Sequence, residues 1–248
     1  MSGHSKWSTI KRQKGAADAK RGQLFTKLAR EITVAARTGL PDPESNARLR
    51  LAIQKARGEN MPKDNIDRAI QRASGGADGA NYDEIYYEGY GPGGTALMIL
   101  AMTDNRNRTV GEIRAALTRA GGSLGESGSV SWMFDQAGII TIPADGTDPD
   151  EIALVAIDAG ATDVQTDDTM VEVYTEPTDL HKVAEQFTSA GYEPQTVELI
   201  MKPKTMLQPD ADAAVKAVRL LEKLEDLDDV QTVYSNLDIS DEVLAQVS

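Results

Sequence analysis

The spacing of apolar residues predicts three helices in the first third of the chain. Apolar side chains recur at helical spacing over residues 22–38, over residues 43–57 and from Pro62 onward. Gly39-Leu-Pro41 ends the first helix, and Pro62 occupies a favoured first position for the third. Three short helices with tight connections indicate a small helical bundle.

After a polar, glycine-rich linker at Ser74–Asn81, the pattern changes to strands that alternate with helices. The first predicted elements are strands at 84–88 and 95–103, a helix at 109–120 and a strand at 129–134. Thr109 and Glu112 form a capping-box pattern for the helix. In the last strand Trp132 and Phe134 alternate with Met133, so we expect both aromatic side chains in a core.

Residues 138–202 predict a self-contained unit with the order βαββαβ, which is the ferredoxin-like or split βαβ arrangement. Its predicted elements are a strand at 138–143, a helix at 149–159, strands at 163–167 and 169–175, a helix at 178–190 and a strand at 195–201. A helix at 210–226 and a strand at 230–236 follow.

These elements predict an α+β fold with an N-terminal three-helix domain and two α/β domains, one ferredoxin-like and inserted in the other. The expected limits are 1–75 for the basic helical domain with its mobile tail, 81–133 together with 205–240 for one α/β domain, and 134–204 for the insertion. Two α/β domains in series are the alternative, but that order leaves the middle segment with few strands.

Charge is divided unevenly along the chain. Residues 1–74 hold 16 Lys and Arg against 7 Asp and Glu, whereas residues 75–248 hold 10 against 32. The net charges of +9 and −22 give the overall −13. A basic segment on an acidic body is the pattern expected of a polyanion binder that approaches its partner head first. A solvated tail that only maintains solubility is the alternative.

Trp7 lies among the clustered cations of the first 30 residues and has the chemistry to stack on a base. We therefore expect the nucleic-acid contacts to come from this segment. The candidate residues are His4, Lys6, Trp7, Lys11, Arg12, Lys14, Lys20, Arg21, Lys27 and Arg30.

Composition excludes several classes of function. The chain has no cysteine and only two histidines, which rules out thiol chemistry and leaves few groups for a triad or a metal site. We therefore expect no enzyme activity, metal, cofactor or small-molecule substrate. We also expect a monomeric protein. The polar N-terminal stretch lacks the apolar core of a secretory signal, and no apolar run is long enough to span a membrane. A mitochondrial transit peptide is the alternative to the cytoplasmic location that we expect.

Two glycine- and arginine-bearing segments are candidates for a second phosphate or partner site. Tyr90, Gly91, Gly93 and Gly94 belong to a G-x-G-x-x-G string, but a strand-like run follows it instead of the helix that a dinucleotide site needs. A tight hairpin-like turn and a flexible loop at a partner surface both explain it.

The second segment is Asn105-Arg-Asn-Arg-Thr109, which lies between a strand and a helix N-terminus, where backbone N–H groups favour an anion. Its candidate residues are Asn105, Arg106, Asn107, Arg108 and Thr109. Local salt bridges of the two arginines with nearby acids are the alternative.

Several strings, in order along the chain, resemble the YebC/PmpR family. They are Gly3-His-Ser-Lys-Trp7, Asp18-Ala-Lys-Arg-Gly22, Phe25-Thr-Lys27, Asn46-Ala-Arg-Leu-Arg50, Asn60-Met-Pro62, Tyr87-Glu-Gly-Tyr-Gly-Pro-Gly-Gly94 and Asp104-Asn-Arg-Asn-Arg-Thr109. The resemblance covers essentially the whole chain. It implies three domains around a cleft, a helical one and two α/β ones.

The resemblance also implies a regulator of gene expression. Members of this family are described as probable DNA-binding transcriptional regulators. Others, including the mitochondrial translational activator of cytochrome c oxidase subunit I, are described as ribosome-associated factors that relieve stalling at sequences such as proline runs. We expect the ribosome, through rRNA or tRNA, as the partner, with DNA-dependent regulation as the alternative. A small-molecule enzyme that uses the cleft is a third hypothesis, which no nucleophile or metal cluster supports.

Overall fold

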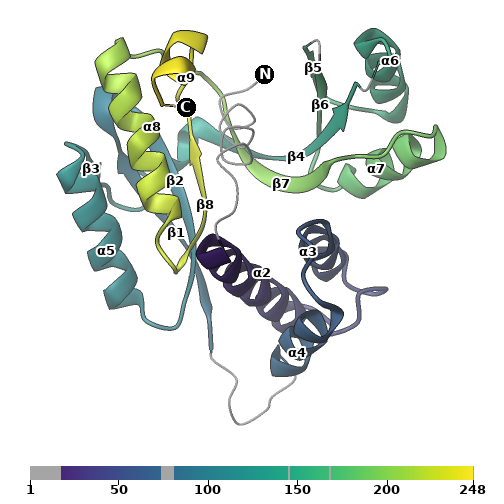
Figure 1. Cartoon of the computed structure of the whole chain (residues 1–248), viewed down its shortest axis with the longest axis horizontal. Helices are drawn as coiled ribbons and strands as arrows, with labels where there is room; N and C mark the ends of the chain where they lie inside the picture. The colour runs from purple at the N-terminus through teal and green to yellow at the C-terminus, as the bar shows by residue number, and fades with distance from the viewer. Residues whose placement is uncertain (1–17, 74–80, 145, 168, 248) are drawn as a thin grey trace.

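The computed structural model describes residues 18–73, 81–144, 146–167 and 169–247. In these ranges the chain forms a helical region and two separate four-stranded sheets with helices packed on them (Figure 1). The mixed helix-and-sheet class predicted from the sequence is therefore confirmed. No helix of the described residues is long and apolar enough to cross a membrane.

The helical region consists of α2 (Asp18–Thr38), α3 (Ala47–Gly58) and α4 (Lys63–Ala73). Their apolar faces meet in one core, in which Leu28, Ile32 and Leu49 are almost fully buried. Asn46 starts α3, because its side-chain oxygen accepts a hydrogen bond from the Leu49 backbone N–H, which has no partner within the helix (3.0 Å). The three predicted helices are confirmed, with α2 beginning four residues earlier than expected.

The first sheet has the strand order β3-β1-β2-β8. Its strands are β1 (Asp83–Tyr90), β2 (Ala96–Thr103), β3 (Ser123–Leu124) and β8 (Val230–Ser235), and all neighbours are antiparallel. The helices α5 (Arg106–Arg119), α8 (Ala211–Glu225) and α9 (Asp241–Val247) supply its core on one face. Because β8 pairs with β2, the last strand of the chain returns to the sheet that β1 and β2 begin.

The second sheet lies between these segments in sequence and has the order β5-β6-β4-β7. The chain runs through β4 (Phe134–Pro143), α6 (Pro149–Ala159), β5 (Asp163–Thr166), β6 (Met170–Thr175), α7 (Leu180–Ser189) and β7 (Thr196–Pro203). This is the predicted βαββαβ order. The predicted domain limits themselves stay a prediction.

The three parts pack against one another. Met98 of β2 and Tyr234 of β8 share a buried cluster with Phe134 of β4 and Ile200 of β7, so the two sheets meet through apolar side chains. Leu51 of α3 packs against the core of the second sheet. These contacts give the helical region a defined position beside both sheets (Figure 1).

Two local predictions are wrong. Ser131–Met133 forms a 3₁₀ turn instead of a strand, so the side chains do not alternate there and Trp132 is 66% exposed, although Phe134 is buried as expected. The helix predicted at 109–120 begins at Arg106, because Asn105 and not Thr109 caps it. Strand β3 and helix α9 had no counterpart in the sequence pattern.

Candidate nucleic-acid interface

Most of the cations predicted to contact nucleic acid lie outside the described residues. His4, Lys6, Trp7, Lys11, Arg12 and Lys14 belong to residues 1–17, and the described side chains begin after Lys20. The structure therefore locates only Arg21, Lys27 and Arg30 of that set, all on α2.

Two of these three cations contact the acidic body of the protein. The Lys27 Nζ donates to the carbonyl oxygen of Glu225, and the Arg30 Nη1 pairs with the Asp229 carboxylate at 3.1 Å. The Arg30 guanidinium also lies 5.3 Å from the centre of the Tyr82 ring, within cation–π range. Lys27 and Arg30 thus hold α2 against the turn between α8 and β8, while Arg21 is exposed.

Two cations of α3 likewise contact other parts of the chain. Arg48 makes a salt bridge of 2.8 Å with Glu84 of β1. The Lys55 ammonium lies 3.4 Å from a carboxylate oxygen of Glu198 on β7 and 3.4 Å from one of Glu31 on α2. Both carboxylates, Glu198 most strongly, raise the pKa of Lys55, so its positive charge is retained at any physiological pH. These basic side chains position the helical region.

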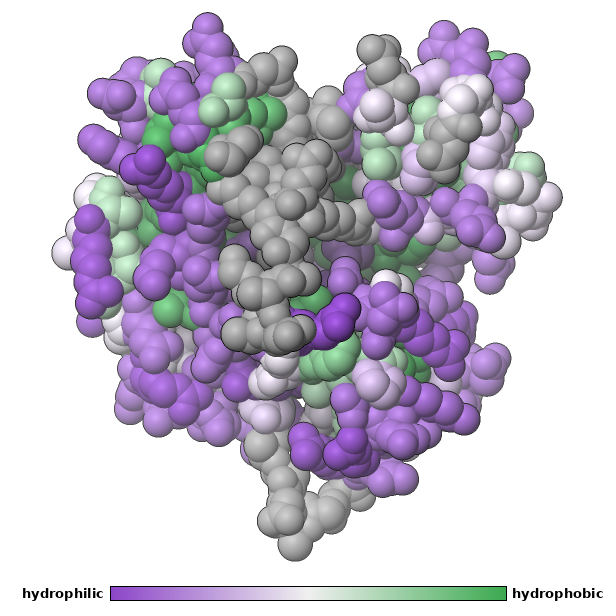
Figure 2. Space-filling view, viewed as in Figure 1, coloured by the Kyte–Doolittle hydropathy of each residue, from purple (hydrophilic) through white to green (hydrophobic). Residues whose placement is uncertain are grey.

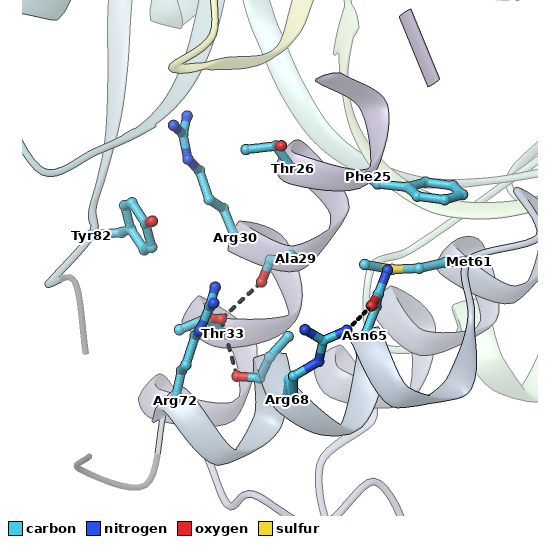
Figure 3. Close-up of a pocket in the computed structure, with 11 residues that line it drawn as sticks. Phe25, Thr26, Ala29, Arg30, Thr33, Met61, Asn65, Arg68, Arg72 and Tyr82 are labelled. Atoms are coloured by element: carbon cyan, nitrogen blue, oxygen red, sulfur yellow. Dashed lines mark hydrogen bonds between the residues drawn. The ribbon is translucent and has the colours of Figure 1, made fainter. Parts of the chain in front are cut away.

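A different set of cations in the helical region is exposed. It comprises Arg21, Arg57, Lys63, Arg68 and Arg72. Arg68 and Arg72 lie on the wall of a pocket of about 220 Å³ between α2 and α4 (Figure 3). Figure 2 shows that hydrophilic residues cover most of the visible face of the helical region. The described surface suited to a polyanion is therefore the α2–α4 side of this region.

Four residues that line this pocket were not among the candidate site residues predicted from the sequence: Phe25, Asn65, Arg68 and Arg72. A signal for three of them exists: Asn65, Arg68 and Arg72 are spaced i, i+3 and i+7, which places them on one face of a helix. No sequence signal indicates that Phe25, on another helix, lies opposite that face.

The two halves of the second candidate site are not brought together. The segment with Tyr90, Gly91, Gly93 and Gly94 joins the end of β1 to the start of β2, whereas Asn105–Thr109 follows the other end of β2. The eight residues of β2 separate them by about 25 Å. One phosphate group therefore cannot contact both segments.

In the Asn105–Thr109 segment, both arginines form ion pairs with acidic residues of the same chain. The Arg106 Nε donates to Asp83 at 2.8 Å, and the Arg108 Nη2 donates to Asp104 and Asp229, each at 2.8 Å. The Asn105 side chain accepts from the Arg108 backbone N–H and caps α5. Asn107 is exposed, and the Thr109 hydroxyl bonds to Asp229. The structure thus has the local salt bridges that were one of the two alternatives.

The glycine-rich segment is a tight connection between antiparallel strands. The Gly91 backbone N–H donates to the Thr95 carbonyl oxygen at 2.7 Å, and the Tyr90 hydroxyl donates to the carbonyl oxygen of Ser129 at 2.9 Å. Gly93 lies against Pro209 and Ala213 at the start of α8. This is the hairpin-like turn proposed from the sequence, and it packs on the protein's own helix.

The packing of this turn can be tested by replacing its two adjacent glycines with alanine. Both Gly93 and Gly94 have positive φ (69° and 80°), but a Cβ on Gly93 would meet the Pro209 Cβ at 2.6 Å, whereas one on Gly94 meets nothing within 4 Å. We expect Gly94→Ala to lower the free energy of unfolding by about 1 kcal/mol. Gly93→Ala should lower it by about 1–3 kcal/mol more, because of the added overlap. Urea unfolding of both variants measures this difference, and equal values would contradict the packing described.

Models of one protein family match almost the whole length of the chain. The family model described as the TACO1/YebC protein N-terminal domain matches residues 5–76, and the model described as the TACO1/YebC second and third domain matches residues 82–237. A "Probable transcriptional regulatory protein" of Roseiflexus castenholzii is 59% identical over 99% of this chain and 98% of its own. One of Geotalea uraniireducens is 53% identical over 98% of each.

A solved structure agrees with this placement. The crystal structure of a conserved hypothetical protein from Aquifex aeolicus matches with a TM-score of 0.85 and 46% identity, and the match covers 92% of this chain and 94% of that one. Family models, relatives and fold thus agree over nearly the full length: the chain belongs to the YebC family.

Proposed function

We propose that the protein is a nucleic-acid-binding regulator of gene expression and acts as a ribosome-associated translation factor that relieves stalling, for example at proline runs. The observation that carries the proposal is the division of charge. The first 74 residues have a net charge of +9 and the rest of the chain −22. Phosphate attracts the first part and repels the second, which orients the protein on an RNA surface.

The arrangement of cations favours irregular RNA over the major groove of a duplex. A major-groove reader presents one helix whose side chains reach base edges. Here Arg48 and Lys55 of α3 form ion pairs with carboxylates of the same chain. On α4, Asp64 and Asp67 are exposed beside the cations, so this helix does not present the continuous basic face that would lie between the two phosphate backbones of a major groove.

DNA-dependent transcriptional regulation is the second candidate, and two observations favour it. The relatives are named probable transcriptional regulatory proteins. In addition, only the four residues 59–62 connect α3 to α4, which is the length found in helix-turn-helix motifs. A footprint on one duplex sequence that survives excess competitor DNA would select this candidate over the first.

Ribosome co-sedimentation tests the first proposal. We expect the full chain to pellet with ribosomes in low salt and to be released as the salt concentration rises, because phosphate contacts exchange with counterions. Deletion of residues 2–21 should remove most of the bound fraction. The matched control is Arg114→Ala with Arg119→Ala, which removes two exposed cations from the acidic body and should leave binding unchanged.

The cellular part of the proposal is tested by ribosome profiling with and without the protein. We expect ribosome density to rise at proline runs when the protein is absent and to return to normal when the full chain is restored. Co-sedimentation that is unchanged by the deletion, together with an unchanged profile, would overturn the proposal.

A further inference from the structure

The pocket between α2 and α4 has the two ends that a nucleotide requires. Its apolar end is formed by Phe25 of α2 and Met61, which precedes α4 (Figure 3). The buried Ala69 also lines the pocket. Phe25 is partly buried against the helical core and also lines the pocket. An accessible aromatic ring beside an apolar wall is the usual stacking surface for an unpaired base.

The other end of the pocket is basic. Of the eleven described residues that line it, three are arginines and none is acidic. Arg68 and Arg72 lie one turn apart on α4, and both are exposed. Within the described part of the chain Arg72 forms no ion pair. Two guanidinium groups one turn apart form a site for a phosphate.

Two further polar groups on the pocket wall can donate hydrogen bonds to a ligand. The Arg68 Nη2 donates to the Asn65 Oδ1, which leaves the Asn65 amide nitrogen as a donor for a base edge or a sugar. The Arg30 Nε is buried and lacks an acceptor among the described residues, although its Nη1 pairs with Asp229. A buried donor without an acceptor is unfavourable by about 1–3 kcal/mol, and a ligand oxygen would relieve this.

We propose that this pocket binds one unstacked nucleotide of a single-stranded RNA, with its base against Phe25 and Met61 and its phosphate at Arg68 and Arg72. The volume of about 220 Å³ is below the roughly 300–1,000 Å³ of pockets for drug-sized ligands, so one nucleotide unit fits better than a larger ligand. A base inside a duplex cannot enter such a pocket, which restricts the partner to unpaired segments. The inference rests on the proposed function and gives it a specific contact.

Fluorescence anisotropy with a labelled ten-residue oligouridine and the full chain tests the proposal. We expect Phe25→Leu, which keeps an apolar side chain but removes the ring, to weaken binding by about tenfold. Phe25→Tyr should bind like the unchanged protein, because stacking is retained. An oligonucleotide of the same length without bases should bind weakly and be insensitive to Phe25→Leu.

The charge contribution is tested separately. Arg68→Ala with Arg72→Ala should lower the salt dependence of oligouridine binding by a slope of about 1–2. The matched control is Arg57→Ala with Lys63→Ala, which removes two exposed cations of the same helical region that do not line the pocket. It should have a smaller effect on both affinity and slope. Equal effects of the two pairs would mean generic charge attraction and would overturn the proposal.

The outcomes separate this inference from the proposed function. Suppose that ribosome co-sedimentation depends on residues 2–21 but oligouridine binding does not change in Phe25→Leu. The proposed function would then stand, and the nucleotide-binding role of the pocket would be refuted. Uridine monophosphate that binds as tightly as the oligonucleotide would also refute it, because the site would then take free nucleotides instead of a strand. A stable, unchanged melting temperature of Phe25→Leu establishes that any loss of binding is local.

Discussion

Replacing Asp229 with alanine is expected to lower the free energy of unfolding by about 2–4 kcal/mol, because the buried hydroxyl groups of Thr103 and Thr109 lose a charged acceptor and the part-buried Arg30 loses its counter-charge. Asp229 is 1% exposed. Its carboxylate accepts hydrogen bonds from Arg108 (2.8 Å), Thr109 (2.7 Å) and Thr103 (3.1 Å) and pairs with Arg30 (3.1 Å). One side chain thereby joins β8, β2, α5 and the helical region.

Urea unfolding followed by circular dichroism measures this loss. Asp226→Ala is the matched control, because Asp226 lies in the same turn but is exposed, and surface substitutions usually change stability by less than about 0.5 kcal/mol. If Asp229→Ala were no more destabilising than Asp226→Ala, the network would not have the structural role assigned to it.

The same carboxylate predicts a dependence on pH. Burial acts to raise the pKa of Asp229, but hydrogen bonds from Thr109, Arg108 and Thr103 outweigh it, so the pKa lies below its ordinary value of 3.8. A lowered pKa in the folded state stabilises the fold at pH values above the ordinary pKa, and this contribution is lost as the pH falls through the folded-state pKa. The stability difference between the unchanged protein and Asp229→Asn should therefore be full at neutral pH and shrink below about pH 3.8.

Periodicity predicts the larger elements of this protein because burial of one face selects residues along a whole helix or strand. Helix α6, for example, has its predicted limits of 149–159. Trp132 was misplaced because a single 3₁₀ turn shifts the alternation, and three residues are too few to reveal a different period. The start of α5 was missed because Thr109 and Asn105 are both residue types that cap helices, and only the fold decides which one does.

Sequence locates charge but not the partners of each charge. The count of cations in the first 74 residues is visible in the sequence, and it still carries the proposed function. Lys27 and Arg30 contact residues near 225–229, which lie about 200 positions away in the sequence. No local sequence pattern connects two segments so far apart. The pocket is a similar case, since Phe25 and Arg68 meet only once α2 and α4 have packed.

Replacing Glu88 with alanine is expected to lower the free energy of unfolding by about 3 kcal/mol or more and to release the loop before Trp132. Glu88 is 6% exposed, and its carboxylate accepts backbone N–H groups of Gly128 (2.7 Å), Val130 (2.7 Å) and Ser131 (2.8 Å). The Val130 donor is buried, so leaving it unsatisfied is unfavourable by about 1–3 kcal/mol, and the Gly128 and Ser131 N–H groups also lose a hydrogen bond to a charged acceptor. Burial acts to raise the pKa of Glu88, but these three bonds lower it below the ordinary 4.5, so acid should weaken the loop as the carboxylate is protonated.

Trp132 reports directly on this loop, because its indole Nε1 donates to the carbonyl oxygen of Ser129 at 3.0 Å. In a Trp7→Phe background, which leaves one tryptophan, Glu88→Ala should change the Trp132 emission and raise its quenching by acrylamide at urea concentrations where the fold persists. Glu126→Ala is the control, since Glu126 is an exposed acid in the same loop, and it should leave both signals unchanged. A loop that keeps its Trp132 signal without the Glu88 carboxylate would show that the backbone alone specifies this turn, and the buried charge would then need another explanation.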